Sequence, residues 1–266
     1  MKKVFKIFKI LLSVVLTAYS IIIIFFLFFS DKEKRYDFAS NLQGNYLSQS
    51  MFEILKFQNP QNDEIYFEQS VPYNKRGDHE RGFELLDKAV EYNPRVYLGY
   101  RGYMKLRFIR DFEGAIKDFN KLDKLTPNVI DTPWGEDIDF LRGEAYYGLG
   151  NYKKAIVHFN QSIENQGEDW AEIQSYVYLG NSELQLENFQ KAINSYKRGL
   201  TQSKFVCEAH LGLAKAYKEI GEIEKAKEHI LKAEKHYRYK RNDPYNEFLN
   251  EIYKTDIVTL KNDLGA

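Results

Sequence analysis

The stretch FLRGEAYYGLGNYKKAIVHFNQSI, residues 140–163, decides the fold. Apolar residues recur with helical spacing on both sides of a turn at Gly150, a pattern typical of two amphipathic helices joined by a short loop. A small residue lies within each helical segment, Gly143 in the first and Ala155 in the second. Because two packed helices need small side chains where their axes come closest, we predict a helical hairpin here.

The same pattern recurs along most of the chain. The small residues of the second segments lie 33, 40, 37 and 34 residues apart, at Gly82, Ala115, Ala155, Ala192 and Ala226. The preceding segments carry their own small residues at Gly102, Gly143, Gly180 and Ala214. Large residues four positions further on should fill the gap to the next hairpin: Leu86, Phe119, Phe159, Tyr196 and Ile230. Since one hairpin cannot bury its apolar face alone, several must stack.

These units resemble tetratricopeptide repeats. The best matches in order and spacing are Gly143, Tyr146, Gly150, Ala155 and Phe159, followed closely by Ala214, Tyr217, Gly221, Ala226 and Ala233. The resemblance covers about residues 63–240 and implies an all-α fold, a right-handed α-solenoid of about five stacked helix-turn-helix hairpins. The chain departs from the family in a long linker after Pro127 and in repeat ends near Gln166 and Lys204 that lack proline.

The N-terminal head predicts a membrane anchor. Residues 10–29, ILLSVVLTAYSIIIIFFLFF, carry no charge, and a helix of that length is about 30 Å long, as a bilayer requires. Four lysines precede this run and three basic residues follow it. That balance favours a cytoplasmic N-terminus and an extracytoplasmic body, periplasmic if the source is a Gram-negative bacterium. The alternative is a cleaved signal peptide, but cleavage near Ala18 would leave IIIIFFLFF on the mature protein.

The predicted organisation places a single transmembrane helix before the repeat array. It comprises a basic tail (1–9), the transmembrane helix (10–29), a polar linker (30–44), an N-terminal capping helix (45–60), the array (61–240), and a C-terminal capping helix and tail (241–266), the last helix expected over 244–261.

The composition excludes several classes of function. Lys plus Arg and Asp plus Glu are both 38, so the net charge is zero and argues against a general nucleic-acid binder. The single cysteine, Cys207, excludes a disulfide framework and is expected to be a structural thiol, although His210 lies one turn further on. His229 and His236 share a face only among lysines, which discourages a metal. With no glycine-rich phosphate loop or nucleophile elbow, we predict no enzymatic activity, no catalytic residues, no metal and no cofactor.

The family resemblance also suggests a binding groove. Repeats of this family can clamp a C-terminal carboxylate with Lys, Asn and Arg side chains, whereas the matching positions here are mostly aromatic, neutral and acidic. Such a groove suits an extended or helical peptide with apolar or basic side chains, although some of these side chains could instead face the core between repeats. The candidate partner-binding positions are Phe67, Val71, Tyr103, Phe140, Glu144, Tyr147, Asn181, Gln185 and Lys218.

Both tryptophans lie in acidic loops that precede a first helix of a repeat. Trp134 is part of TPWGED, and Trp170 is part of GEDWAE. They form either an interaction rim, since tryptophan is enriched in binding hot spots, or staples that fold back over their loops. We include both among the candidate partner-binding residues.

The sequence as a whole predicts a membrane-anchored scaffold or adaptor that binds a protein or peptide partner and no nucleic acid. The alternative is a small-ligand binder that holds a glycan on aromatic side chains. The sequence leaves the identity of the partner, the pathway, the organism and the oligomeric state open.

Overall fold

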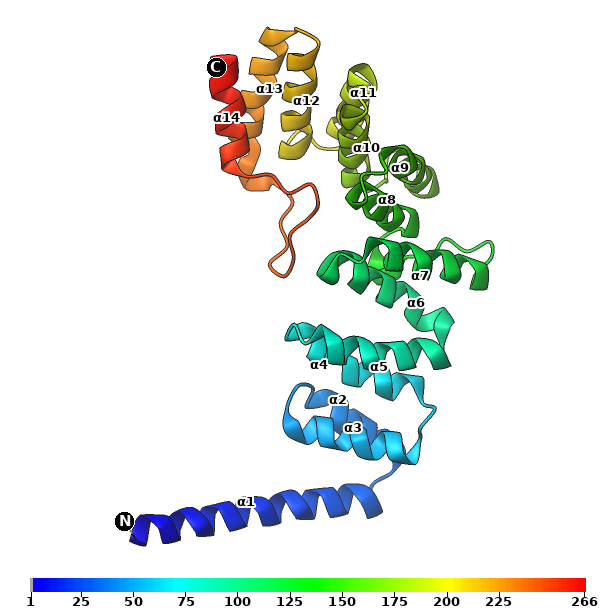
Figure 1. The fold of residues 1–266 in the computed structure, drawn as a ribbon, viewed down its shortest axis with the longest axis vertical. Helices are drawn as coiled ribbons and strands as arrows, with labels where there is room; N and C mark the ends of the chain where they lie inside the picture. The colour runs from blue at the N-terminus through cyan, green and yellow to red at the C-terminus, as the bar shows by residue number, and fades with distance from the viewer. Residues whose placement is uncertain (1) are drawn as a thin grey trace. The chain divides into compact units, whose positions relative to one another are not determined.

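The computed structural model describes residues 2–266, and these residues form helices without a strand (Figure 1). They divide into two compact units, one ending at Tyr97 and one beginning at Leu98. The elements are α1 (Lys2–Phe28), α2 (Lys32–Asn41), α3 (Tyr46–Gln58), α4 (Asp63–Lys75), α5 (His79–Tyr92), α6 (Pro94–Met104), η1 (Lys105–Ile109), α7 (Phe112–Leu125), η2 (Pro133–Gly135), α8 (Ile138–Gly148), α9 (Tyr152–Gln166), α10 (Ile173–Gln185), α11 (Phe189–Gln202), α12 (Cys207–Glu219), α13 (Ile223–His236), η3 (Tyr237–Tyr239) and α14 (Lys254–Leu264).

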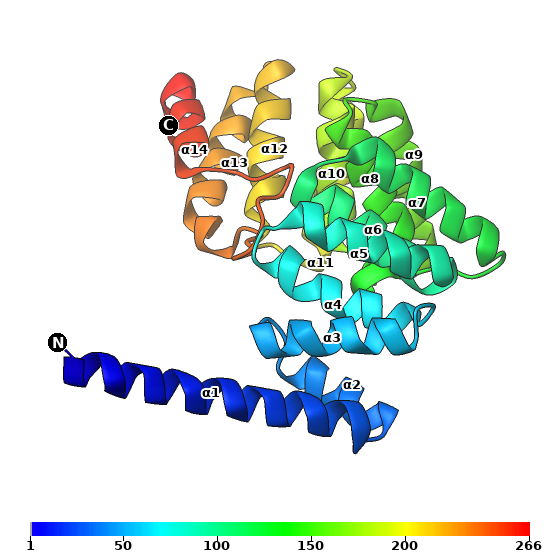
Figure 2. The same cartoon turned by 60° about the horizontal axis from the view of Figure 1, so that its bottom comes forward.

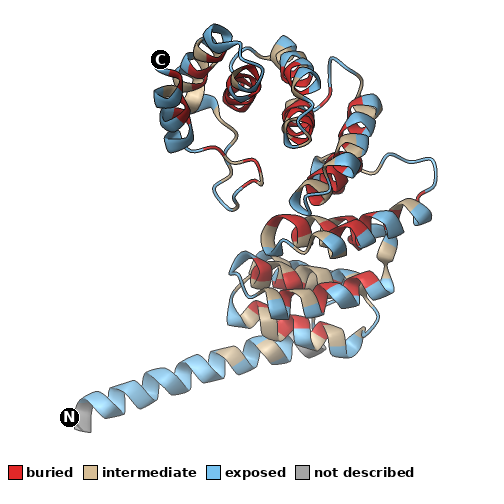
Figure 3. Cartoon of the chain, turned by 45° about the horizontal axis from the view of Figure 1, so that its top comes forward, coloured by how far each residue is buried: buried red, intermediate tan, exposed pale blue. Residues whose placement is uncertain are grey.

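Helix α1 of the first unit is long and apolar enough to cross a membrane. The candidate span is Val4–Phe25, with a mean hydropathy of 2.4 and no part of it buried. The exposed length of α1 is visible as blue ribbon in Figure 3. The helix also includes most of the basic tail expected over 1–9, of which Met1 lies outside the described residues. Within the candidate span, the Tyr19 hydroxyl donates a hydrogen bond to Ser50 Oγ of α3 at 2.8 Å.

The expected linker over 30–44 contains a helix, α2, which the sequence analysis missed. The Asp31 side chain accepts a hydrogen bond from the backbone N–H of Lys34 at 2.8 Å and thereby caps its first turn. Ala39 is buried in an apolar cluster with Met51, Phe52, Leu55 and Ile65. Helix α3, expected as a lone capping helix over 45–60, therefore packs against α2 as one half of a hairpin.

The second unit contains the best-matching repeats, the hairpins α8–α9, α10–α11 and α12–α13. A Cβ atom added to Gly143 would lie 2.5 Å from the Phe159 ring, so glycine is required where α8 meets α9. The Phe159 ring also stacks on Tyr178 of the next hairpin, with centroids 5.3 Å apart. Small and large residues therefore hold each hairpin together and join it to the next, as the sequence pattern predicts.

The chain ends in a shorter helix than predicted. Residues 244–253 form no helix, and α14 covers only Lys254–Leu264. Helix α14 packs against α13, which lies between α12 and α14 (Figures 1 and 2). Ile257, Leu260 and Leu264 join the apolar core of this last hairpin. The residues between Tyr239 and α14 form an irregular segment with a turn at 249–250, and their contacts explain why the helix begins late.

Candidate functional site

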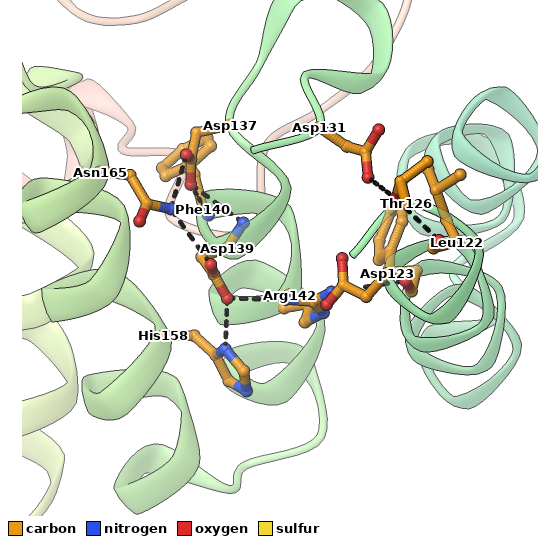
Figure 4. Close-up of polar contacts among 11 residues, drawn as sticks. Leu122, Asp123, Thr126, Asp131, Asp137, Asp139, Phe140, Arg142, His158 and Asn165 are labelled. Carbon is orange, nitrogen blue, oxygen red and sulfur yellow. Dashed lines mark hydrogen bonds and ion pairs between the residues drawn. The ribbon is translucent and has the colours of Figure 1, made fainter. Parts of the chain in front are cut away.

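Helix α8 carries three of the predicted partner-binding residues, and a polar network fixes its first turn (Figure 4). Asp137 caps the helix by accepting the backbone N–H groups of Asp139 and Phe140 at 2.9 and 3.0 Å. The Asp139 carboxylate accepts hydrogen bonds at 2.8 Å from Arg142 and His158 Nδ1. Because these side chains come from α8 and α9 together, the network holds the position of α8 within its hairpin.

A buried cluster of opposite charges lies at the middle of α8. Glu144 is 1% exposed, and its carboxylate pairs with the Arg107 guanidinium at 2.6 Å. Arg107 also pairs with Glu136 at 2.6 Å. Burial raises the pKa of Glu144, and the charges of Arg107 and Arg241 oppose that rise. Two carboxylates in this position therefore require cationic partners.

Arg107 reaches this cluster from an irregular turn. The residues Lys105–Ile109 form a single π-helical turn after α6, and Arg110 ends the turn in a left-handed conformation with φ of 53°. Such turns often occur at functional sites in helical proteins. The side chain of Arg107 is only 5% exposed, so the π turn delivers a buried cation to the acidic residues of α8.

The second cation of the cluster comes from the chain's own C-terminal segment, residues 240–253, which we call the tail segment. The Arg241 guanidinium lies 3.4 Å from Glu144 and 3.6 Å from Glu136. It also lies 3.6 Å from the centroid of the Phe248 ring. Arg107 lies 5.1 Å from the same ring. The Phe248 ring is therefore flanked by two guanidinium groups, and each of them makes a cation–π contact with it.

The tail segment is seated as an irregular, non-helical peptide. It bends at residues 244–245 and turns at 249–250, where the backbone N–H of Glu251 donates to the Phe248 carbonyl at 3.1 Å. Phe248, Asn250 and Ile252 are buried on either side of this turn. The Asn250 side chain donates a hydrogen bond to Gln174 of α10 at 3.0 Å, and the backbone N–H of Arg241 donates to Glu208 of α12 at 2.6 Å. The segment therefore contacts three successive first helices of the repeats.

The tail segment covers the predicted groove only in part. A cleft of about 250 Å³ remains beside it. The predicted residues Tyr147, Asn181 and Gln185 line this cleft, opposite residues 249–252 of the tail segment. Phe140 is buried, and the Arg241 guanidinium lies 5.6 Å from its ring centroid. Five predicted positions thus lie along or under the tail segment, and we call Phe140, Glu144, Tyr147, Asn181 and Gln185 the groove.

The other predicted binding positions lie elsewhere. Phe67 and Val71 belong to α4 of the first unit, where the Phe67 ring stacks on Tyr97 at 4.9 Å. Tyr103 is half-buried beside Arg107 and faces Trp134. Lys218 pairs with Asp263 of α14 at 3.2 Å. These four residues remain predictions as binding residues, and the last of them contacts the C-terminal helix.

The two tryptophans occupy different environments. Trp134 rests against Tyr100 and Tyr103, with ring centroids 5.0 and 6.2 Å away, and remains 64% exposed. Trp170 is 85% exposed. Its loop is held instead by Glu168, which pairs with Arg198 at 2.6 Å. The staple interpretation therefore fits Trp134, and the rim interpretation fits Trp170.

A second cavity, of about 570 Å³, lies between α12 and α13 and contains three of the histidines. His210 Nδ1 and His229 Nδ1 are 3.0 Å apart, and the His236 ring stacks on His210 at 5.8 Å. His210, which the sequence analysis considered as a partner of Cys207, therefore pairs with His229. The Cys207 thiol is buried and donates to the Ala233 carbonyl at 3.1 Å, and burial raises its pKa to about 12. These contacts fit the structural thiol that the sequence predicts.

Comparison with known proteins identifies the repeats. The family model described as tetratricopeptide repeat matches residues 140–169 and 208–235. The chain carries tetratricopeptide repeats. Helices α8–α9 and α12–α13 occupy the matched ranges, and the repeat array is an all-helical α-solenoid, as the sequence predicts. A search of curated proteins found no match.

Solved structures of tetratricopeptide-repeat proteins share this fold. PilW, described as a widely conserved type IV pilus biogenesis factor, has a TM-score of 0.59 and 14% identity over 79% of this chain and 96% of its own. MamA from Desulfovibrio magneticus RS-1 has a TM-score of 0.58 and 19% identity over 66% and 96%. YrrB, described as a TPR protein with an unusual peptide-binding site, has a TM-score of 0.55 and 16% identity over 70% and 92%. At these identities the likeness concerns the fold alone.

Sequence reasoning missed four residues that complete the site: Arg107, Glu136, Arg241 and Phe248. Arg107 lies in a π turn, which interrupts the helical period that the repeat pattern follows. Arg241 and Phe248 belong to a stretch that was predicted in part as helix. No hydrophobic period marks Phe248 and its neighbours, because the turn at 249–250 and the polar Asn250 interrupt any alternation.

Proposed function

We propose that this chain is a membrane-anchored adaptor whose tetratricopeptide repeats bind an extended segment of a partner protein. The groove and its buried carboxylates already hold a non-helical segment of this chain, since the tail segment places a guanidinium beside Glu144 and an aromatic ring beside Arg107. This is the observation that carries the proposal. Tetratricopeptide repeats are typically non-enzymatic scaffolds, so the proposal includes no catalytic step.

A peptide suits the groove better than a glycan does. Glycan binding needs exposed aromatic faces, whereas Phe140 is 1% exposed and Tyr147, the other aromatic residue of the groove, is only partly exposed. The accessible cleft beside the tail segment offers amide and carboxylate groups of Asn181, Gln185 and Glu208 instead. Such groups can satisfy the backbone and side chains of an extended peptide.

The apolar helix α1 supports the membrane part of the proposal. The span Val4–Phe25 has the length and hydropathy of a transmembrane helix. The four lysines before residue 10 favour a cytoplasmic N-terminus, which would place the repeats on the extracytoplasmic side. An anchored array meets membrane-bound partners at a raised effective concentration.

The test is crosslinking of the full-length protein in cells of its natural host. A photoactivatable residue at Gln185, an exposed groove position, should capture a discrete set of proteins. The matched control carries the same group at Val157, which is 63% exposed on the second helix of a repeat. Capture at Val157 alone, or equal capture at both sites, would contradict the assignment of the groove.

Protease treatment of intact spheroplasts tests the orientation. We expect digestion of the repeat array, since the proposal places it outside the cytoplasm. Protection of the array in intact spheroplasts, with digestion after lysis, would place the partner in the cytoplasm instead.

A further inference from the structure

We propose that the tail segment, residues 240–253, is an internal competitor that occupies the groove until a partner with the same recognition chemistry displaces it. This inference rests on the proposed function of the groove. It goes further by defining the partner as a protein segment that presents a cationic side chain stacked on an aromatic ring.

The charges of the buried cluster define the cation. With the tail segment seated, Arg107 and Arg241 balance Glu136 and Glu144, two charges against two. Without Arg241, the two carboxylates share only Arg107, and one negative charge is left in a largely buried site. An uncompensated buried charge is costly. Any segment that replaces the tail segment must therefore bring a positive charge to Glu144.

The position of Phe248 defines the aromatic group. Its ring lies between the guanidinium groups of Arg107 and Arg241 and is 8% exposed. The remaining space around it, lined by Leu106, Arg110 and Leu249 among others, measures only about 10 Å³. The site therefore fits an aromatic side chain closely, and loss of the Phe248 ring would leave Arg107 only its more distant contact with Tyr103, at 5.9 Å.

The contacts of the tail segment allow it to leave without unfolding the repeats. Arg241 meets its carboxylates at 3.4 and 3.6 Å, longer than the 2.6 Å pairs of Arg107. The Arg110–Glu247 pair is 3.4 Å long and half exposed. Beyond the tail segment, Ile257, Leu260 and Leu264 hold α14 in the last apolar core, which Ile252 of the tail segment also joins. Release of the tail segment would break the hydrogen bonds to Gln174 and Glu208 and expose Phe248. A partner segment must therefore replace these contacts, while α14 and α13 stay packed.

The first experiment measures binding of a synthetic peptide, KRNDPYNEFLNEIY, to the full-length protein in detergent by fluorescence anisotropy. Its sequence is that of the tail segment. In the wild type the protein's own tail segment competes with the synthetic peptide for the groove. Because the tail segment is tethered, it acts at roughly millimolar effective concentration. The double variant R241A/F248A should vacate the groove and bind the labelled peptide at least about tenfold more tightly, because the fraction of open sites rises.

Two matched variants control this measurement. The pair N242A/Y245A changes exposed residues of the same segment, since Tyr245 is 84% exposed and Asn242 is exposed. It should bind the peptide as the wild type does. Adding Glu144→Gln to R241A/F248A should remove the gain, because the carboxylate that receives the peptide's arginine is lost. Equal affinity in wild type and R241A/F248A, or a gain that survives Glu144→Gln, would overturn the proposal.

Hydrogen exchange of the wild-type protein gives a second test that does not depend on the variants folding. With the protein labelled with ¹⁵N and unlabelled peptide at saturation, NMR should show faster exchange of the protein's backbone amides at 242–251, while those of α12 and α13 keep their protection. Unchanged exchange in 242–251 would mean that the tail segment is a permanent part of the fold. These outcomes use the chain's own sequence as the probe, so they are independent of whether crosslinking at Gln185 captures a cellular partner.

Discussion

At the scale of single residues, Gly143 and Phe159 illustrate how the repeats are packed. The Phe159 ring occupies the space that a side chain at position 143 would need. The same arrangement recurs between Gly180 and Tyr196, where an added Cβ would lie 2.5 Å from the ring. Gly143 and Gly180 thus mark the places where an aromatic ring crosses from one helix to the other.

Replacement of Gly143 by alanine should lower the free energy of unfolding by about 1–3 kcal/mol, because the Phe159 ring must move within a filled core. Thermal unfolding followed by circular dichroism measures the loss. The exposed Lys153→Ala on α9 is the control and should change stability little. A Gly143→Ala protein as stable as this control would mean that the hairpin is packed more loosely than described.

The two tryptophans predict opposite effects of substitution. Trp134→Ala should lower the melting temperature by a few degrees because its contacts with Tyr100 and Tyr103 are lost. Trp170→Ala should leave the melting temperature unchanged, since its side chain is 85% exposed, but should reduce capture of a protein partner in cells. The rim interpretation of Trp170 fails if its removal changes stability and leaves capture intact.

The histidine pair predicts a loss of stability in mild acid. Burial, with the nearby charges of His210 and Lys232, lowers the pKa of His229 to about 4. The ring also faces Lys197 and Glu228. The unfolded chain therefore binds a proton near pH 6.5 that the folded chain binds only near pH 4, so stability falls as the pH drops through that window.

Thermal unfolding between pH 7.5 and 4.5 checks this expectation. His229→Gln keeps a hydrogen-bond donor for His210 but cannot titrate. The melting temperature of this variant should therefore fall less with decreasing pH than that of the wild type. The two proteins should differ least at pH 7.5. If the melting temperature falls as steeply with pH in the variant as in the wild type, groups other than His229 cause the loss of stability.

At the scale of elements, the π turn η1 and the helix α8 act together. The turn places Arg107 against Glu136 and Glu144, and the network around Asp139 fixes α8 from its first turn (Figure 4). The irregular turn is thus as much a part of the site as the helix, because Arg107 comes from η1 and Glu144 comes from α8.

Removal of the buried cation tests this pairing. Arg107→Ala should cost about 3–5 kcal/mol, because two carboxylates would then share only Arg241. Arg110→Ala, which removes a half-exposed cation three residues away, should cost less than about 1 kcal/mol. Urea unfolding measures both values, and equal costs would contradict the role given to Arg107.

At the scale of the whole molecule, the apolar helix α1 and the repeats differ in how much of their apolar surface is buried. The span Val4–Phe25 has no buried part, whereas the repeats bury their apolar residues in cores of their own. A helix of this kind is stable in lipid, where its backbone is satisfied internally. The full-length protein should therefore behave as an integral membrane protein.

Alkaline carbonate extraction checks this expectation. The full-length protein should remain in the membrane pellet, and a chain lacking residues 2–30 should be released. Release of the full-length protein, or an N-terminus that begins beyond residue 18 when sequenced, would favour the signal-peptide alternative.

The sequence by itself determined the repeats, because small and large residues at fixed helical spacing can pack in only a few ways. It also determined the apolar span, which depends on length and composition alone. Glu144, Tyr147, Asn181 and Gln185 could be assigned to one face because the family pattern fixes their register.

Only the tertiary structure decided what lies on that face. Helix α2 is stabilised by burial of Ala39 against α3 and by the Asp31 cap, and the repeat pattern has no equivalent of either. The tail segment remains non-helical because Phe248, Asn250 and Ile252 find partners on helices other than α14. Local propensity favoured a helix there, but buried charge and ring contacts between distant residues outweigh it, and such contacts are not encoded in any local period of the sequence.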